Sequence, residues 1–259
     1  GTAIVTLGAL FNALKVVGKD LAEVRIVQVG AGAAGSAILR LLLAAGAKNV
    51  VVADVEGIIH EGRENLHPSL EWIAEQTNRD GLRGTLHQAL EGADVFIGVS
   101  APNLLTEEDV ASMAEDAIVF AMANPVPEID PVIATRHAAV VATGRSDFAN
   151  QINNVLAFPG VFRGLIDARS TRITNEMLIA AANAVADVVT EEELNATYIV
   201  PSVFHSGLHT AVAKSVQVVA ERDAEELAAE AEEAERAEEA APRSGDLATV
   251  FKRSTRTTR

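Results

Sequence analysis

A glycine-rich turn between a strand-like run and a helix-like run constrains this chain more than any other feature. The turn reads Gly30-x-Gly32-x-x-Gly35; a run rich in Val and Ile precedes it, and apolar residues at helical spacing follow it. Strand, glycine turn and helix in this order form a phosphate-binding βα unit. Gly30 permits the tight turn, Gly32 lets the backbone approach a pyrophosphate, and Gly35 lets the helix pack closely on its strand. The helix N-terminus, at Ala33 and Ala34, would then present unpaired N–H groups to the anion.

The next strand-like run indicates a dinucleotide as the ligand. Residues 49–54 read Asn-Val-Val-Val-Ala-Asp, and Asp54 lies 19 residues beyond Gly35. A dinucleotide-binding unit places at this position the carboxylate that hydrogen-bonds the 2′-hydroxyl of the adenosine ribose. The stretch also fits the length of about 30 residues that such a βαβ unit needs. The sequence therefore predicts dinucleotide binding; the alternative is a glycine turn that opens an ordinary parallel α/β unit.

Composition disfavours several other classes of protein. The 259 residues are 49% hydrophobic and include no cysteine, so a sizeable core is available, whereas disulfides and thiolate metal sites are not. No apolar run approaches the ~20 residues of a membrane span, and residues 2–17 lack the features of a signal peptide. The net charge of −15 argues against nucleic acid and anionic membranes as partners. We expect a cytoplasmic protein.

The negative charge is concentrated toward the C-terminus. Residues 221–240 carry ten Asp and Glu against two Arg, with high helix propensity and almost no large apolar side chain. We expect a solvated extension, helical in part or disordered, that Pro242 and Gly245 end and a short basic tail follows. The predicted organisation is a dinucleotide-binding domain over residues 1–222 and a charged extension over residues 223–259.

Helix-like and strand-like runs alternate along the chain. We expect strands over residues 24–29, 49–54, 94–99, 117–122 and 139–142, and helices over residues 2–17, 33–46, 69–77, 85–90, from 106, 174–189 and 206–222. Strands separated by helices favour a parallel sheet. The predicted fold class is therefore α/β, a Rossmann-type doubly wound parallel sheet with flanking helices and a C-terminal acidic helical extension.

Three expected strands end in polar, glycine or proline residues. The segments that follow them are residues 98–102, which include Ser100, residues 121–125, which include Asn124, and residues 143–147. Ligands of open parallel sheets bind outside the carboxyl ends of the strands, so these segments should meet the glycine turn at one edge. Pro125 favours an extended backbone at Asn124, whose amide would project from a stiff segment. The alternative is that Asn124 only completes a turn.

Longer stretches of the sequence resemble a known family over roughly residues 1–220. The matching stretches are G-T-A-I-V at 1–5, V-G-A-G-A-A-G at 29–35, D-V-E-G-I-I-H-E-G-R at 54–63, G-V-S-A-P at 98–102, F-A-M-A-N-P-V-P-E-I at 120–129 and G-R-S-D-F-A-N-Q-I-N-N-V-L-A-F-P-G-V-F-R-G at 144–164. Together they resemble the nucleotide-binding domain of malic enzymes, in particular of prokaryotic forms. Asn103 and Val126 stand where the family tends to have glycine and threonine, and neither position carries expected chemistry.

The resemblance implies the oxidative decarboxylation of (S)-malate. Malic enzymes oxidise malate with NAD⁺ or NADP⁺ and decarboxylate the bound oxaloacetate to pyruvate, and a Mg²⁺ or Mn²⁺ ion stabilises the enolate. By position, Gly30 to Gly35 would hold the pyrophosphate, Asp54 the adenosine ribose, and Asn124 would lie at the nicotinamide and malate. Asn153 and Asn154 would contact the substrate carboxylates, with Asn154 preferred. Ser100 would lie beside the cofactor.

The resemblance also implies that the catalytic groups lie outside this sequence. In the family a lysine and a tyrosine act as base and acid, and these residues and three acidic metal ligands precede the segment matched here. We therefore expect no catalytic residue and no metal ligand in this chain, which would bind the dinucleotide without turnover. The chain begins with Gly1, which fits a processed chain or a piece of a longer one. His205 and His209 have i, i+4 spacing, but we expect two polar positions at a helix N-terminus.

Several points of function stay open at this stage. We expect NAD over NADP, because Asp54 would repel a 2′-phosphate and residues 55–57 supply no cation; Arg63 is the nearby candidate to supply one. Alternatives to a malic enzyme are a malolactic-type enzyme, a Rossmann domain like that of amino-acid dehydrogenases, and a non-catalytic dinucleotide-binding module. We expect the full-length protein to be a homo-oligomer.

Overall fold

The computed structural model of the chain describes residues 1–240, with side chains to residue 236. The strands are β1 (Arg25–Val29), β2 (Asn49–Asp54), β3 (Gly57–Ile58), β4 (Val95–Gly98), β5 (Ile118–Ala121) and β6 (Val140–Thr143). The helices are α1 (Thr2–Val17), α2 (Ala33–Ala44), α3 (Pro68–Gln76), α4 (Leu86–Leu90), α5 (Glu107–Ala111), α6 (Pro131–Ala134), the 3₁₀ turn η1 (Asn154–Leu156), α7 (Phe158–Asp167), α8 (Asn175–Asp187) and α9 (Leu208–Ala240).

The described strands form one mixed sheet in the order β3-β2-β1-β4-β5-β6. Five of these strands, β1, β2, β4, β5 and β6, run parallel. Strand β2 lies on one side of β1, and β4, β5 and β6 follow one another on its other side. The predicted Rossmann-type sheet is confirmed. The short antiparallel edge strand β3 was not predicted, because two residues carry no alternating pattern.

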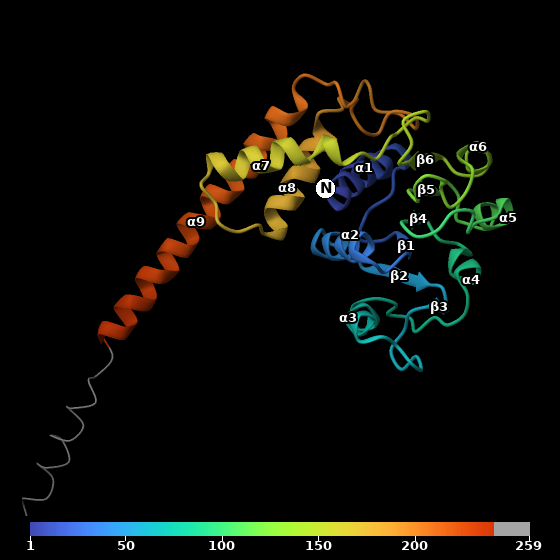
Figure 1. Ribbon diagram of the computed structural model, residues 1–259, viewed down its shortest axis with the longest axis horizontal. Helices are drawn as coiled ribbons and strands as arrows, with labels where there is room; N and C mark the ends of the chain where they lie inside the picture. Colours follow the sequence, from blue (N-terminus) through green and yellow to red (C-terminus); the bar gives the residue numbers. More distant parts are fainter. Residues whose placement is uncertain (241–259) are drawn as a thin grey trace, which may run out of the picture.

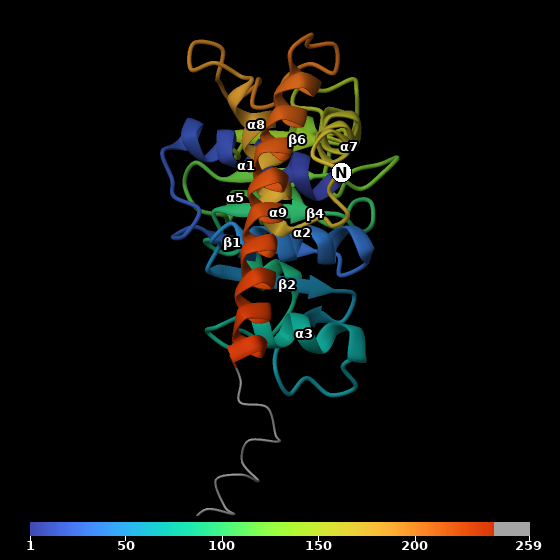
Figure 2. The same ribbon diagram turned by 90° about the vertical axis from the view of Figure 1, so that its left-hand side faces the viewer.

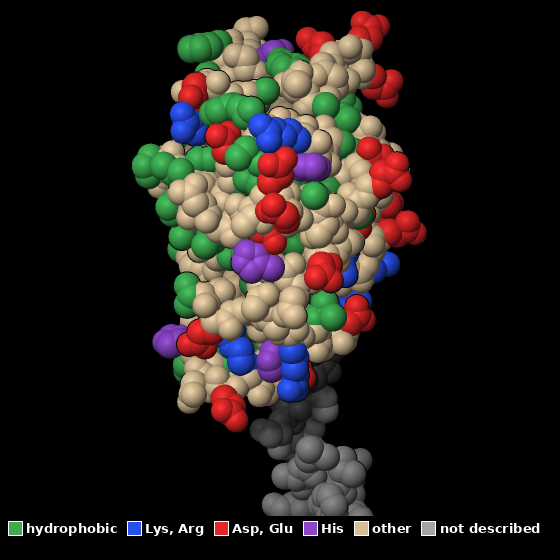
Figure 3. Space-filling model, turned by 90° about the vertical axis from the view of Figure 1, so that its right-hand side faces the viewer, with side chains coloured by type: hydrophobic (Ala, Val, Ile, Leu, Met, Phe, Trp, Pro, Cys, Tyr) green, Lys and Arg blue, Asp and Glu red, His purple; other side chains and the backbone are tan. Residues whose placement is uncertain are grey.

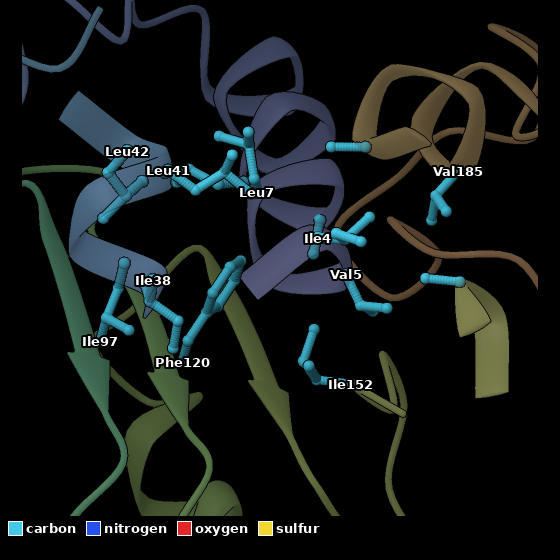
Figure 4. Close-up of a cluster of buried hydrophobic side chains, with 14 of the residues drawn as sticks. Ile4, Val5, Leu7, Ile38, Leu41, Leu42, Ile97, Phe120, Ile152 and Val185 are labelled. Atoms are coloured by element: carbon cyan, nitrogen blue, oxygen red, sulfur yellow. The ribbon is translucent and has the colours of Figure 1, made fainter. Parts of the chain in front are cut away.

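The strands are apolar on both faces, so each face of the sheet has a core of its own. Alternate residues point to opposite faces: Ile26 and Ile97 face the side of α1 and α2, and Val27 and Phe96 face α4, α5 and α6. Figure 4 shows the first of these cores, where α1 and α2 meet the strands around Phe120. Continuous apolar runs are what a parallel sheet covered on both faces requires.

Helices α7, α8 and α9 form a further layer outside α1 (Figures 1 and 2). Helix α7 was not predicted from the sequence, and it contains Pro159, Gly160 and Gly164, residue types that are unfavourable inside an isolated helix. Pro159 stands in the first turn, where its missing N–H costs nothing, and both glycines face α9. A Cβ on Gly160 would lie 2.6 Å from the Cβ of Val212, so these glycines let α7 and α9 pack closely.

Helix α9 begins in this layer and extends well past the body of the molecule (Figure 1). The proposed domain boundary at residues 222 and 223 falls inside this continuous helix, and from Ala224 to Arg236 its residues are exposed. Pro242, Gly245 and the basic tail lie outside the described residues. Within the described part of the chain, no helix is both long enough and apolar enough to cross a membrane.

Candidate functional site

The glycine turn joins the end of β1 to the start of α2, as the motif predicts. Gly30 has φ +103°, and a Cβ there would lie 2.7 Å from the carbonyl oxygen of Val99. A Cβ on Gly35 would collide with the carbonyl oxygen of Gly30, so both glycines serve the fold. Gly32 has φ −74°, and a Cβ there would meet no atom within 4 Å. Neither backbone nor packing requires glycine at position 32, and the space beside it is open to a ligand.

A buried glutamine, Gln28, is hydrogen-bonded to the backbone of this turn. The Nε2 of Gln28 donates to the carbonyl oxygens of Gly30, at 3.1 Å, and of Gly35, at 3.0 Å. Gln28 is fully buried in β1, and its Oε1 has no partner among the described residues. The sequence analysis missed this residue. The signal was present, because a glutamine inside a β-branched run and two residues before a glycine turn needs a buried hydrogen-bond partner.

Asp54 ends β2, and Arg63 binds it directly. The two Nη atoms of Arg63 donate to the two carboxylate oxygens of Asp54 at 2.9 and 2.5 Å, and the side chains are 12% and 17% exposed. Burial raises the pKa of the Asp54 carboxyl, but hydrogen bonds from Arg63 and the Glu56 amide outweigh it, and the pKa lies below its ordinary value. Asp54 is therefore a carboxylate at neutral pH, with a cation beside it.

Asp54 lines a cavity of about 300 Å³ beyond the end of β2. Val29 and Leu86 contribute apolar walls, Val55 is almost fully exposed at the rim, and Ser100 lies on the side of β4. An apolar slot beside a carboxylate suits an adenosine, because the flat faces of its base pack against apolar side chains and its ribose carries hydroxyl groups.

A second cavity, of about 450 Å³, adjoins the first at Ser100. Its lining includes Ala34 from the first turn of α2, Asn124 from the segment after β5, and the pair Asn153 and Asn154. The structure therefore brings together the glycine turn, Ser100 and the three asparagines that the sequence analysis singled out. A larger open groove of about 630 Å³, between α7 and α9, carries none of the expected site residues.

The three asparagines are held in different ways. Asn124 is exposed and follows β5, and its bond to Pro125 is cis. The Oδ1 of Asn153 accepts the N–H of Val155 at 3.1 Å and thereby caps η1. The Oδ1 of Asn154 accepts the hydroxyl of Thr2 at 2.9 Å. In both Asn153 and Asn154 the oxygen is engaged, which leaves the amide N–H groups as the donors that can face a ligand.

His205 and His209 lie near the start of α9. His209 lies in the first turn of α9, and its Nε2 is 3.0 Å from the carbonyl oxygen of Val155; His205 lies in the turn before this helix. Among the described residues, no group of three His, Asp or Glu side chains is placed to hold a metal ion. The Mg²⁺ or Mn²⁺ ion that the resemblance implies thus finds no ligand set in this part of the chain.

Charges on the surface are mixed. On the face that Figure 3 shows, Lys and Arg side chains lie in separate small groups between acidic ones. A nucleic-acid surface has instead a continuous basic patch, and this face offers none.

Comparison with known proteins agrees with this geometry. Residues 1–221 match the family model described as the NAD-binding domain of malic enzyme. The chain is 54% identical over 222 residues to an NAD-dependent malic enzyme of Geobacillus stearothermophilus, covering 86% of this chain and 46% of that protein. It is 52% identical over 218 residues to a bifunctional malic/malolactic enzyme of Bacillus subtilis, covering 83% of this chain and 53% of that protein.

A solved structure has the same fold. The crystal structure of a malic enzyme from Pyrococcus horikoshii superposes with a TM-score of 0.82 at 43% identity, covering 86% of this chain and 54% of that one. The chain therefore spans about half the length of each of these three relatives.

Proposed function

The chain belongs to the malic enzyme family, as its NAD-binding domain, and from this premise we propose that it binds NAD and presents it to malate. In the full-length protein this would serve the conversion of (S)-malate to pyruvate and CO₂. The observation that carries the proposal is the pair of cavities joined at Ser100, one with Asp54 and the other with the asparagines. A dinucleotide is a ligand with two such halves and a diphosphate between them.

Each residue of the candidate site has a part in this proposal. The N–H groups at the start of α2 would hold the diphosphate, and the open space beside Gly32 suits its close approach. Asp54 would accept a hydrogen bond from the adenosine ribose. When bound, the nicotinamide supplies the hydride acceptor of the reaction. Asn124, Asn153 and Asn154 would orient malate, because amide N–H groups bind carboxylates without adding charge.

Among the described residues, no group of His, Asp and Glu side chains is placed to hold the metal ion of this reaction. We propose that this chain by itself binds the dinucleotide and does not turn malate over, and that the full-length protein works as a homo-oligomer. Both points rest on the family resemblance.

NAD is the preferred cofactor in this proposal. Both Nη atoms of Arg63 are engaged by Asp54, and Glu56 lies 3.8 Å from the same guanidinium. Two carboxylates therefore share one cation, and a 2′-phosphate would enter a region of net negative charge. A ribose hydroxyl, by contrast, can donate to the Asp54 carboxylate.

Titration calorimetry with NAD⁺ and NADP⁺ tests both the site and the preference. We expect NAD⁺ to bind at least about tenfold more tightly, which corresponds to ~1.4 kcal/mol. Asp54→Ala removes the acceptor and frees Arg63, so the ratio of the two affinities should shrink or invert, whereas Glu61→Ala, an exposed acid on the same loop, should leave it unchanged. Absence of NAD⁺ binding would refute the proposed function, and tighter binding of NADP⁺ would refute the preference alone.

A malolactic activity of the full-length protein is the second candidate. The relative from Bacillus subtilis is described as bifunctional, and it is 52% identical to this chain. The products of the full-length protein separate the two, because pyruvate with net formation of NADH indicates a malic enzyme and lactate indicates the malolactic reaction.

A further inference from the structure

A glutamate is completely buried beneath the second cavity. Glu128 has 0% exposure and lies seven residues after the end of β5. Its Oε1 accepts the N–H of Ser100 at 3.0 Å, and its Oε2 accepts the N–H of Ala123 at 2.9 Å. One carboxylate thus bridges two backbone segments that are far apart in the sequence.

The two bridged segments are the ones that line the cavity. Ser100 follows β4 and Ala123 follows β5, and both residues are in the wall of the second cavity beside Asn124. The strands β4 and β5 are neighbours in the sheet, but their hydrogen bonds end before these residues. Beyond the ladder, the Glu128 carboxylate is a link between the two segments.

The glycine that ends β4 makes room for this carboxylate. Gly98 has no positive φ, so its backbone does not demand glycine. A Cβ on Gly98 would instead lie 2.5 Å from the Oε1 of Glu128. Gly98 and Glu128 are therefore matched to each other across the two segments.

A buried carboxylate is costly, and packing alone does not require one. Burial raises the pKa of the Glu128 carboxyl above its ordinary value, although the N–H groups of Ala123 and Ser100 act in the opposite direction. An apolar side chain would fill the same volume without this cost. A carboxylate offers a separate oxygen to each of the two backbone N–H groups, as Glu128 does here.

We propose that Glu128 is a positioning residue of the dinucleotide site: its carboxylate fixes the segments that carry Ser100 and Asn124, and through them the nicotinamide half of the cofactor. This inference rests on the proposed NAD site. The adenosine and diphosphate half depends on the glycine turn and Asp54, and no hydrogen bond joins either of them to Glu128 among the described residues. Ser100 borders both cavities, so the segment of Ala123 and Asn124, which lines the second cavity and not the first, distinguishes the two halves.

The test compares NAD⁺ with ADP, which lacks the nicotinamide half, as ligands of the chain and of its Glu128→Gln variant. Glutamine has nearly the same shape but only one acceptor, so one of the two backbone N–H groups loses its partner. We expect NAD⁺ affinity to fall about tenfold and ADP affinity to stay within about twofold. The matched control is Glu108→Gln, which removes the same charge from an exposed position. Equal losses for NAD⁺ and ADP, or no loss for either, would overturn the inference.

A second measurement does not depend on any cofactor. Amide hydrogen exchange followed by NMR should show faster exchange at Ser100 and Ala123 in Glu128→Gln, and unchanged exchange in the strands β1 and β2. Unchanged exchange at both amides would overturn the positioning role even if NAD⁺ failed to bind the parent chain. If Glu128→Gln does not fold, Gly98→Ala, which crowds the same carboxylate from β4, should give the same pattern with the two ligands, and its failure to do so would overturn the inference.

Discussion

At the scale of the residue, the three glycines of the turn differ in whether the fold requires them. The fold requires Gly30 because its φ is positive, and it requires Gly35 because a Cβ there would collide with the carbonyl oxygen of Gly30. Gly32 is required for neither reason, since an added Cβ would enter open space. The motif in the sequence contains all three, and only the structure separates the two that support the fold from the one that borders open space.

Gly32→Ala should weaken the dinucleotide without weakening the protein. The φ of −74° at this position suits alanine, so we expect the melting temperature to change by no more than a few degrees. The new methyl group would occupy the space into which the diphosphate fits, and NAD⁺ affinity should fall at least about tenfold. Calorimetry and thermal unfolding on the same sample measure both. Gly35→Ala is the contrasting variant, because its Cβ would collide with Gly30 and lower the melting temperature itself. Unchanged NAD⁺ affinity in Gly32→Ala would place the diphosphate elsewhere.

The placement of the candidate residues was predictable where a residue belongs to a local motif. The glycines, Asp54 and Asn124 lie at or just after strand ends, and the topology of a parallel sheet brings such positions to one edge. Arg63 was visible only as a nearby cation, and its bidentate pairing with Asp54 depends on how the loop after β3 folds back. Gln28 and Glu128 were missed, because their partners are backbone groups. Gln28 had a local signal, a polar residue inside an apolar run, whereas no local pattern indicates the partners of Glu128.

At the scale of the element, the strands and the longer helices follow from the sequence and the irregular ones do not. The predicted helix over residues 2–17 matches α1 and the predicted strand over residues 49–54 matches β2, because long apolar runs with glycine or polar boundaries leave little choice. Helix α7 was missed, because its glycines serve tertiary packing and read locally as breakers. Close packing on α9 overrides their low helix propensity.

Gly164→Ala tests this account of α7. Alanine has the higher intrinsic helix propensity, so an isolated helix would gain stability from the change. In the protein the added Cβ would collide with the carbonyl oxygen of Ala213 and approach Val216, so we expect a loss of about 1–3 kcal/mol in the free energy of unfolding. Chemical denaturation measures this loss. Ala180→Gly on the half-buried side of α8 is a control for propensity alone. A stabilised Gly164→Ala protein would contradict close packing as the reason for the glycine.

At the scale of the whole molecule, the chain is a two-faced sheet with its candidate site at one edge and a helical layer outside α1. The acidic end of α9 leaves this body and is exposed. The high helix propensity of glutamate and alanine explains how this run can be helical without a core. The fold brings the glycine turn, the Asp54 carboxylate and the asparagines together at this candidate site. The chain spans about half the length of the relatives from Geobacillus stearothermophilus and Pyrococcus horikoshii. Its described residues include the candidate site and no group of side chains placed to hold a metal ion.

The most direct measurement is a crystal structure of this chain grown with saturating NAD⁺. The account predicts the diphosphate at the N-terminus of α2 beside Gly32, a ribose hydroxyl donating to the Asp54 carboxylate, and the nicotinamide in the cavity lined by Asn124 and Asn154. An empty crevice at saturating NAD⁺, or a cofactor bound away from the end of β1, would contradict it.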